Sequence, residues 1–360
     1  MGSDHHQWDI PPSWQPAIEA ARAGGTLFLI GETDSGKSTL AAVLANDARA
    51  AGRSTAVVDA DVGQSSIGPP ACVGLADVRR RFDYLCDLPA RAIDFVGACS
   101  PVGHLLQAAA STAALVSSAR QGGAETIVVD TTGLVSGGVA RALKGAKIRL
   151  VEPDAIVALQ EEDEVEHLLA GYRSRSRPRV LRLRLSRAVK PRPREERAAR
   201  RQRSFAVYFS GARAVELPWD DVPVENGAWT SGEPVPGHMR AYAEECVACE
   251  VVHMERHAEG VFLIVEGRPD PNGLRDLGNS FQGRALVVEQ ASLHNLLVGL
   301  LDEAGATRAL AILEEVDFRQ RRMGLYTPLA DEGAARGLRL GSIQLARDGT
   351  QLGTADASGE

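Results

Sequence analysis

The 360-residue sequence lacks the features of membrane and exported proteins. No apolar stretch approaches the roughly 20 residues that a helix needs to span a bilayer. The first residues, MGSDHHQWDIPPSW, do not show the basic and then apolar pattern of a signal peptide. The five cysteines are odd in number, and their spacing forms no disulfide framework. These absences predict a protein of the reducing cytoplasm with no membrane partner.

Charge is distributed unevenly along the chain. The net charge is −7, yet residues 173–203 carry fourteen Arg or Lys residues against two Glu residues. A basic block inside an acidic protein is typical of a segment that binds phosphate or a polyanion. A solvated basic face or an arginine-rich linker gives the same composition, so both interpretations stay open.

The order of apolar runs predicts the fold class. Runs that end in Gly or Asp alternate with helical patterns up to about residue 210, which predicts an α/β domain: a parallel sheet with helices on both faces. The segment GETDSGKST at residues 31–39 makes this a P-loop NTPase-type parallel sheet. The expected strands are 25–31, 54–60, 93–97, 126–130 and 155–160, and the expected helices are 37–50, 102–121, 137–146 and 162–171.

A different pattern begins after residue 210. Short alternating runs are separated by Glu-Gly, Glu-Ala-Gly and Asp-Gly turns, which predicts a smaller, mostly antiparallel β domain. The predicted organisation is an N-terminal segment over 1–24, a P-loop domain over 25–210 with an arginine-rich segment at about 173–205, and a β-rich domain over 211–360.

The segment GETDSGKST, Gly31 to Thr39, matches the pattern G-x-x-x-x-G-K-[ST] between an expected strand and an expected helix. In such a loop, backbone N–H groups and the helix N-terminus surround phosphate groups. Lys37 is expected to reach the β- and γ-phosphate oxygens, and the Ser38 hydroxyl to bind Mg²⁺. The predicted nucleotide-binding residues are Gly31, Thr33, Asp34, Ser35, Gly36, Lys37, Ser38 and Thr39.

Asp130 ends a β-branched strand and is followed by Gly133. An acid in this place usually holds Mg²⁺ through its water shell, and Asp-x-x-Gly also senses the γ-phosphate in GTPases. A guanine-specific enzyme would carry Asn-Lys-x-Asp after the next strand, where this chain reads ALQEEDE. The sequence therefore favours ATP as the nucleotide, with Mg²⁺ as its metal.

Asp59 and Asp61 end the neighbouring strand and are not needed for the same metal. Transfer of a phosphoryl group to an alcohol requires a carboxylate that orients the hydroxyl and accepts its proton. Asp61 is the candidate for this role, which favours a kinase over a hydrolase. Either acid could instead cap the turn or bind the metal, and Asp59 is the candidate for those roles. Gln64 is either a phosphate or water ligand or an ordinary loop residue.

The basic block contains a predicted helix over 192–205 that starts after Pro193. Arg197 and Arg201 lie four residues apart on one face, from which a mobile lid can neutralise charge on the transferred phosphoryl group. Arg200 points elsewhere on this helix and is a reserve candidate.

The segment CVACEVVHMERH spaces Cys246, Cys249, His253 and His257 as in some zinc sites. His253 and its neighbours read as a β-strand, in which residues four apart do not converge as they do on a helix. Core packing is therefore favoured over zinc.

Taken together, these motifs resemble the polynucleotide 5′-hydroxyl kinases of the RNA-processing type, which include the pre-mRNA cleavage-complex and pre-rRNA-processing kinases. The segments that carry the resemblance are GETDSGKSTL, DADVGQSSIGPP, FVGACSPVGH, VVDTTGLVSGG and the arginine lid that leads to Tyr208 and Phe209.

The resemblance implies roles for single residues. Lys37, Ser38 and Thr39 would bind ATP and magnesium, Asp61 would activate the 5′-hydroxyl, and Arg197 and Arg201 would be the catalytic lid arginines. Thr132, Gly133 and Leu134 fall on the substrate-binding Thr-x-Gly-Trp segment of the family.

Two departures from the family pattern stand out. Leu134 replaces the Trp that stacks on a nucleobase, and leucine offers no π-face. The β domain that precedes the kinase core in larger eukaryotic members has no room before a P-loop at residue 31.

The expected activity is ATP-dependent phosphorylation of the 5′-hydroxyl of RNA, with DNA as a further acceptor. A P-loop NTPase switch or assembly factor that binds RNA or a protein partner is the alternative, and a small-metabolite kinase is a third. The basic block is larger than a small acceptor requires.

Overall fold

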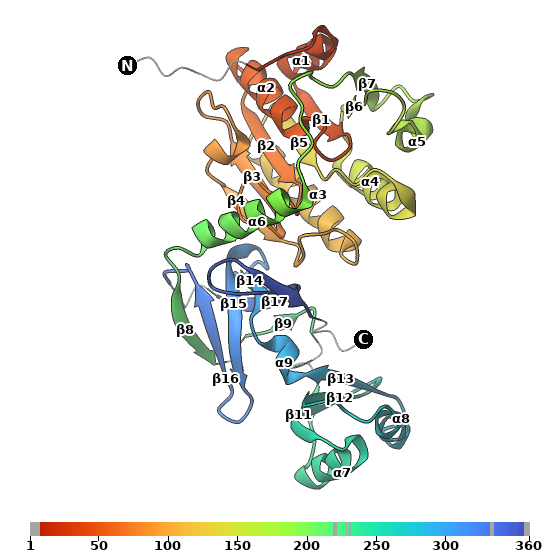
Figure 1. Ribbon diagram of the computed structural model, residues 1–360, viewed down its shortest axis with the longest axis vertical. Coiled ribbons are helices and arrows are strands. Elements are labelled where there is room, and N and C mark those ends of the chain that lie inside the picture. Colours follow the sequence, from red (N-terminus) through yellow and green to blue (C-terminus); the bar gives the residue numbers. More distant parts are fainter. Residues whose placement is uncertain (1–7, 219–221, 228, 230–231, 332–334, 356–360) are drawn as a thin grey trace. The chain divides into compact units, whose positions relative to one another are not determined.

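The computed structural model describes residues 8–218, 222–227, 229, 232–331 and 335–355 (Figure 1). The chain forms two compact units, Met1–Ser204 and Phe205–Glu360. The boundary falls inside helix α6 (Arg194–Tyr208), a few residues before the change in sequence pattern at residue 211. Each unit is described separately below.

The first unit is built on a twisted sheet whose strand order is β4-β3-β2-β5-β1-β6-β7. Its strands are β1 (Gly25–Ile30), β2 (Thr55–Ala60), β3 (Cys72–Asp77), β4 (Ala92–Phe95), β5 (Thr126–Thr131), β6 (Ala155–Leu159) and β7 (Arg179–Leu183). Its helices are α1 (Gln15–Ala23), α2 (Lys37–Ala50), α3 (Leu105–Gln121), α4 (Gly137–Val151), α5 (Glu166–Leu169) and the start of α6.

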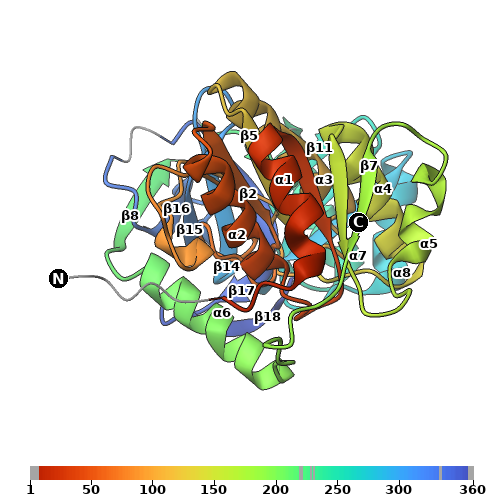
Figure 2. The same ribbon diagram turned by 90° about the horizontal axis from the view of Figure 1, so that it is seen from above.

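Alternate residues of the central strands face two separate cores. Leu29, Val57 and Val128 pack with α1 and α2 on one face, where these two helices are seen in front of the sheet in Figure 2. Val58 and Val129 pack with α3 and α4 on the other face. This alternation decides which helix each functional side chain meets at the strand ends, because successive side chains point to opposite faces.

All five strands expected in this unit are confirmed, and its central strands β2, β5, β1 and β6 are parallel. Two strands were missed. β3 runs antiparallel to β2 and β4, so the sheet is not wholly parallel at that edge. β7 pairs in parallel with β6 and carries part of the basic block along the opposite edge.

The second unit contains two sheets in its described part. One has the order β18-β17-β14-β15-β16-β8, with β9 beside β17, and the other has the order β10-β11-β12-β13. The strands are β8 (Arg213–Pro218), β9 (Val224–Glu225), β10 (Glu233–Pro234), β11 (Glu250–His257), β12 (Gly260–Glu266), β13 (Arg284–Glu289), β14 (Leu296–Leu301), β15 (Thr307–Asp317), β16 (Arg322–Thr327), β17 (Gly337–Leu345) and β18 (Gln351–Thr354).

The β-rich character expected of this unit is confirmed, but the smaller sheet differs from the expectation. Helices α7 (Gly237–Val247) and α8 (Pro271–Ser280) pack on it, a short helix α9 (Gln290–Leu293) follows β13, and β12 and β13 are parallel. The α8 segment connects these parallel strands, as a parallel pair requires.

Within the part of the chain that the structure describes, no helix combines the length and apolar character needed to span a bilayer.

Candidate active site

The P-loop lies between β1 and α2, as the sequence predicts. Gly36 and Asp34 adopt left-handed backbone conformations with φ of 88° and 58°. Lys37 is the first residue of α2 and is buried, and its Nζ donates to the Glu32 carbonyl at 2.6 Å and to Ser35 Oγ at 3.3 Å. The loop therefore turns its lysine inward, while Thr33, Ser38 and Thr39 stay exposed.

Electrostatics around Lys37 fit a phosphate site. Burial lowers the pKa of Lys37, and the charges of Asp130, Asp61 and Asp34 act in the opposite direction. Acids from three separate elements thus lie close enough to influence one amine. An anion bound beside it would relieve the unfavourable burial of its charge.

Ser38 and Asp130, which the sequence predicts to bind the metal, are in direct contact. The Ser38 hydroxyl donates to Asp130 Oδ2 at 2.6 Å, because Asp130 points to the α2 face of the sheet. Asp130 Oδ1 is buried and has no hydrogen-bond partner in the structure. A buried carboxylate oxygen without a partner is unfavourable unless a cation or its water supplies one. The donor set, one hydroxyl and one carboxylate, suits Mg²⁺, which keeps several waters and binds phosphate oxygens.

Asp59 lies opposite Asp130 in the register of β2 and β5 and is buried. Burial and the neighbouring charge of Asp130 raise the pKa of Asp59 to about 7. Both of its oxygens accept backbone N–H groups: Oδ1 from Asp61, and Oδ2 from Ser66 and Ile67. These contacts make Asp59 a residue that holds the turn after β2, the capping role that the sequence left open for it.

Asp61 is half-buried, and unlike Asp59 it has one carboxylate oxygen without a hydrogen bond in the described part of the chain. Its Oδ1 accepts the N–H groups of Gly63 and Gln64, both at 3.1 Å. Its Oδ2 has no hydrogen-bond partner among the described residues. The side chain is therefore fixed through one oxygen, and the other oxygen is left without a hydrogen bond to any residue that the structure describes.

The lid helix α6 begins after Pro193, as predicted, and its first turns meet both loops of the site. Arg197 Nη1 lies 3.2 Å from Asp34 Oδ2, so this lid arginine is bound to the P-loop. Gln64 Nε2 donates to the Arg197 carbonyl at 3.3 Å, and Arg200 donates to Ser66 Oγ at 3.1 Å.

The two remaining lid candidates differ in their contacts. Arg201 is half-buried and close enough to Cys99 to lower the pKa of that thiol, against the larger effect of burial. Arg200, the reserve candidate, instead contacts the loop that follows Asp61 directly. The structure therefore brings Arg197 into contact with the P-loop and Arg200 into contact with the loop after β2, and places Arg201 beside Cys99.

The Thr132-Gly133-Leu134 turn follows β5 and approaches the P-loop closely. A Cβ atom on Gly133 would lie 2.4 Å from the backbone nitrogen of Thr33, so only glycine permits this approach. The Thr132 hydroxyl is buried and has no hydrogen-bond partner in the structure. Leu134 packs against the core that α3 and α4 cover.

Sequence reasoning missed two lysines that lie beneath the site. Lys144 and Lys147 on α4 are fully buried, with 1% and 0% exposure, and their Nζ atoms donate to oxygens at the ends of β5 and β2. A signal was present in the sequence, because both fall on the helix face that Ala140, Leu143 and Val151 share.

The cysteine and histidine cluster belongs to the second unit. His253 and His257 lie on β11, as predicted, while Cys246 is on α7. His253 Nε2 lies 2.7 Å from Glu255 Oε1, and its ring stacks on Phe318. Among the described residues, no group of three or more His, Cys, Asp or Glu side chains is placed to hold a metal ion.

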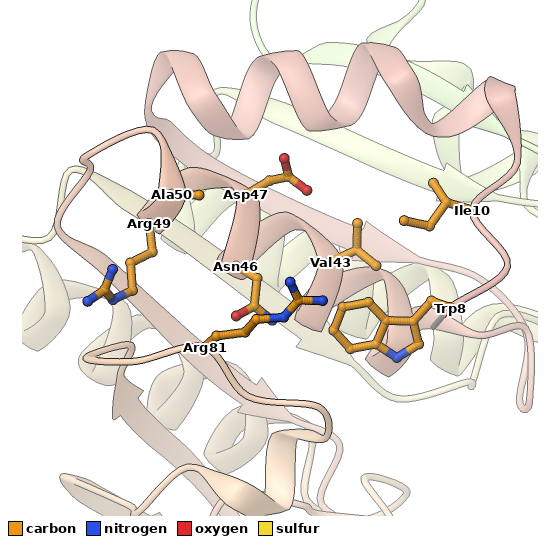
Figure 3. Close-up of a pocket in the computed structure, with 8 residues that line it drawn as sticks. All are labelled: Trp8, Ile10, Val43, Asn46, Asp47, Arg49, Ala50 and Arg81. Atoms are coloured by element: carbon orange, nitrogen blue, oxygen red, sulfur yellow. The ribbon is translucent and has the colours of Figure 1, made fainter. Parts of the chain in front are cut away.

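A pocket of about 250 Å³ lies along the C-terminal half of α2 (Figure 3). It is lined by Trp8, Ile10, Val43, Asn46, Asp47, Arg49, Ala50 and Arg81. None of these is a predicted site residue, and Asn46 is engaged with the backbone of Phe82. The catalytic candidates converge instead at the opposite end of α2.

The part of the sequence that carries these site residues matches a known protein family. Residues 31–211 match the family model described as the P-loop of the mRNA cleavage and polyadenylation factor CLP1. The chain belongs to the CLP1 P-loop family. Its matched region covers the P-loop, both acid-bearing strand ends and the lid.

Relatives of this family match most of the chain. A polyribonucleotide 5′-hydroxyl-kinase of Pyrococcus horikoshii is 30% identical over 340 residues, which are 94% of this chain and 91% of the relative. A polyribonucleotide 5′-hydroxyl-kinase of Methanocaldococcus jannaschii is 31% identical over 332 residues, which are 92% of this chain and 90% of the relative. A CLP1 homologue of Brugia malayi is 30% identical over 214 residues, which are 55% of this chain and 47% of that protein.

A solved structure shows the same fold. Wild-type Clp1p, in a complex with Pcf11p, matches with a TM-score of 0.59 at 12% identity, over 92% of this chain and 78% of that one. At that identity the likeness concerns the fold alone.

Proposed function

We propose that this protein transfers the γ-phosphate of ATP to the 5′-hydroxyl of a polynucleotide, RNA rather than DNA. The observation that carries the proposal is the division between the two acids at the site. Asp130 contacts Ser38 and leaves a buried oxygen for a cation. Asp61 contacts neither Ser38 nor Asp130 and leaves one oxygen for an acceptor. The kinase names of the archaeal relatives support the same activity.

The residues divide the reaction among them. Lys37 and the P-loop N–H groups hold the β- and γ-phosphates. The 5′-oxygen attacks the γ-phosphorus while Asp61 Oδ2 accepts the hydroxyl proton; the bond between the γ-phosphorus and the β,γ-bridging oxygen breaks, and ADP leaves. Arg197 leaves Asp34 and neutralises charge that develops on the phosphoryl group. Ser38 and Asp130 would hold Mg²⁺, which when bound would supply positive charge to stabilise the phosphate groups.

Exposed charge supports a polynucleotide as the acceptor rather than a small alcohol. The segment that runs from β7 to α6 carries exposed arginines without an acidic partner in the described part of the chain: Arg179, Arg184, Arg187 and Arg194. The segment is fixed where it passes the P-loop, because Val189 lies against Gly36 and the Arg192 N–H donates to Asp34. Exposed guanidinium groups without an acidic partner suit the phosphates of a nucleic-acid backbone.

The free state of all five cysteines fits a reducing compartment, and we place the reaction in the cytoplasm.

The test is a transfer assay with γ-labelled ATP and Mg²⁺, using matched 5′-hydroxyl RNA and DNA oligonucleotides. We expect label at the 5′ end, with RNA preferred, and none on oligonucleotides that already carry a 5′-phosphate. ATP hydrolysis without a labelled product, stimulated by RNA, would instead indicate the NTPase switch. Labelling of a small alcohol but no oligonucleotide would contradict a polynucleotide acceptor.

A further inference from the structure

Two lysines on α4 lie in a place where lysine is rarely found. Lys144 and Lys147 are fully buried, although lysine is almost never fully buried without an ionic partner. In the described part of the chain neither forms an ion pair, and the oxygens that they contact are neutral. Burial lowers the pKa of Lys147 to about 8 and the pKa of Lys144 well below its usual value. Folding alone does not favour this arrangement.

Lys144 connects three elements of the active site. Its Nζ donates to Thr131 Oγ1 and to the Thr132 carbonyl, both at 2.6 Å. The Thr131 hydroxyl in turn donates to the Leu29 carbonyl at 2.7 Å, near the end of β1. The next residue after Thr132, Gly133, touches the backbone of Thr33. One amine thus links α4, the end of β5, the end of β1 and, through Gly133, the P-loop.

Lys147 acts on the other acid-bearing strand. It lies three residues after Lys144, on the same buried face of the helix, and its Nζ donates to the Ala60 carbonyl at 3.3 Å. Ala60 directly precedes Asp61, and the charges of Asp61 and Asp59 raise the pKa of Lys147 against the effect of burial. This lysine therefore holds the strand end from which the proposed base projects.

A purely structural explanation does not account for the residue type. The surrounding positions of α4 are apolar, and methionine has nearly the length and shape of lysine without its amine. A buried amine without an ionic partner carries a desolvation cost that an apolar side chain of similar volume does not. Where a sequence departs from what stability favours, the departure is expected at functional sites.

We propose that Lys144 and Lys147 are positioning residues of the phosphoryl transfer: Lys144 holds the Thr132–Gly133 turn against the P-loop, and Lys147 holds the end of β2 that carries Asp61. The inference rests on the proposed kinase activity. The inference links each lysine to a different substrate. Lys144 positions the loop that binds ATP, and Lys147 positions the strand end that carries the base for the 5′-hydroxyl acceptor.

The test uses Lys144→Met and Lys147→Met in the full chain, with Arg149→Met as the control. Arg149 is exposed on the same helix, so this control removes one positive charge without changing the buried face. The measurements are the melting temperature, kcat, and the KM values for ATP and for a 5′-hydroxyl RNA. Binding of a non-hydrolysable ATP analogue is measured in the same variants.

We expect both methionine variants to melt at or above the temperature of the unmodified protein and to lose tenfold or more in kcat. Lys144→Met should also weaken analogue binding threefold or more, whereas Lys147→Met should leave it within twofold. The control should match the unmodified protein. A loss of kcat in proportion to a lower melting temperature would show that the lysines only support folding, and unchanged kcat would overturn the inference.

A double-mutant cycle tests whether Lys147 acts through Asp61. In an Asp61→Asn background, Lys147→Met should reduce the residual kcat by less than threefold, since the base it positions is already gone. Multiplicative losses would overturn the assignment. If Lys147→Met does not fold, Lys147→Gln replaces it in the same cycle.

Failure of the proposed function is distinguishable from failure of this inference. An unmodified protein that labels no oligonucleotide contradicts the kinase proposal, and analogue binding still reports on Lys144: unchanged binding in Lys144→Met overturns its role. An active unmodified protein with fully active lysine variants overturns the positioning role alone.

Discussion

Replacing Asp61 by asparagine separates the chemical role of this side chain from its structural one. Asp61 Oδ1 accepts the N–H groups of Gly63 and Gln64, and an asparagine carbonyl can accept both. The amide nitrogen would then occupy the place of Oδ2, the oxygen assigned to the acceptor. The turn after β2 is preserved, and only the proton acceptor is removed.

The expected changes in rate and in stability follow from the role of the base and from these two hydrogen bonds. A positioned general base contributes about 10²- to 10⁴-fold, or about 3–5 kcal/mol of transition-state stabilisation. Because Asp61→Asn keeps both backbone hydrogen bonds, its stability should change by less than about 0.5 kcal/mol. Asp61→Ala also removes those two bonds, each worth about 1 kcal/mol, and water replaces part of this at a half-exposed site.

The assay measures kcat for transfer to a 5′-hydroxyl RNA, the affinity for ATP, and urea unfolding for both variants. We expect Asp61→Asn to lose 10²-fold or more in kcat while ATP affinity stays within threefold and the unfolding curve does not move. Asp61→Ala should lose as much activity and also unfold at lower urea. Transfer by Asp61→Asn at more than a tenth of the unmodified rate would refute the assignment of the base.

Three further predictions concern the lid, the basic segment and α4. Asp34→Asn removes the charged partner of Arg197 and with it an ion pair worth about 0.5–1 kcal/mol. Without nucleotide, trypsin should therefore cleave the lid about two- to fivefold faster. An unchanged cleavage rate would show that this ion pair does not hold the lid. Arg184→Gln combined with Arg187→Gln should weaken binding to single-stranded RNA, as measured by fluorescence anisotropy. The slope of log affinity against log salt should fall by about 0.7 for each phosphate that the variant no longer neutralises. An unchanged slope would exclude these arginines from RNA binding. Burial lowers the pKa of Lys147 to about 8, so the unfolded chain binds more protons than the folded one between that value and about 10.5; stability to urea should therefore rise with pH in this range more steeply in the unmodified protein than in Lys147→Met, and equal slopes would contradict the burial of this amine.

The parts of the site that the sequence predicted depend on local motifs. The P-loop needs only a strand, a glycine-rich turn and a helix in succession, so Lys37 and Ser38 were placed correctly. Asp130 was recognisable because a parallel sheet brings its strand ends to one edge, which then places it beside Ser38. The sequence favoured Asp61 as the base and Asp59 as the turn cap or metal ligand, but it left both alternatives open, because these roles depend on which backbone N–H groups the following turn presents.

The parts that were missed depend on packing between distant segments. β3 is antiparallel because residues 61–71 form a connection without a helix, which is too short to return the chain for a parallel strand. The ion pair between Arg197 and Asp34 joins residues 163 positions apart. Lys144 and Lys147 fit the buried face of α4, but the usual preference of lysine for the surface conceals that position in a sequence.

The central claim is that one acid serves the cation and another serves the acceptor. A structure with a non-hydrolysable ATP analogue, Mg²⁺ and a short 5′-hydroxyl RNA measures this directly. We predict the 5′-oxygen at about 2.6–3.2 Å from Asp61 Oδ2, with Mg²⁺ on the side of Ser38 and Asp130. A metal ion bound directly by Asp61, with the 5′-oxygen out of its reach, would contradict the account.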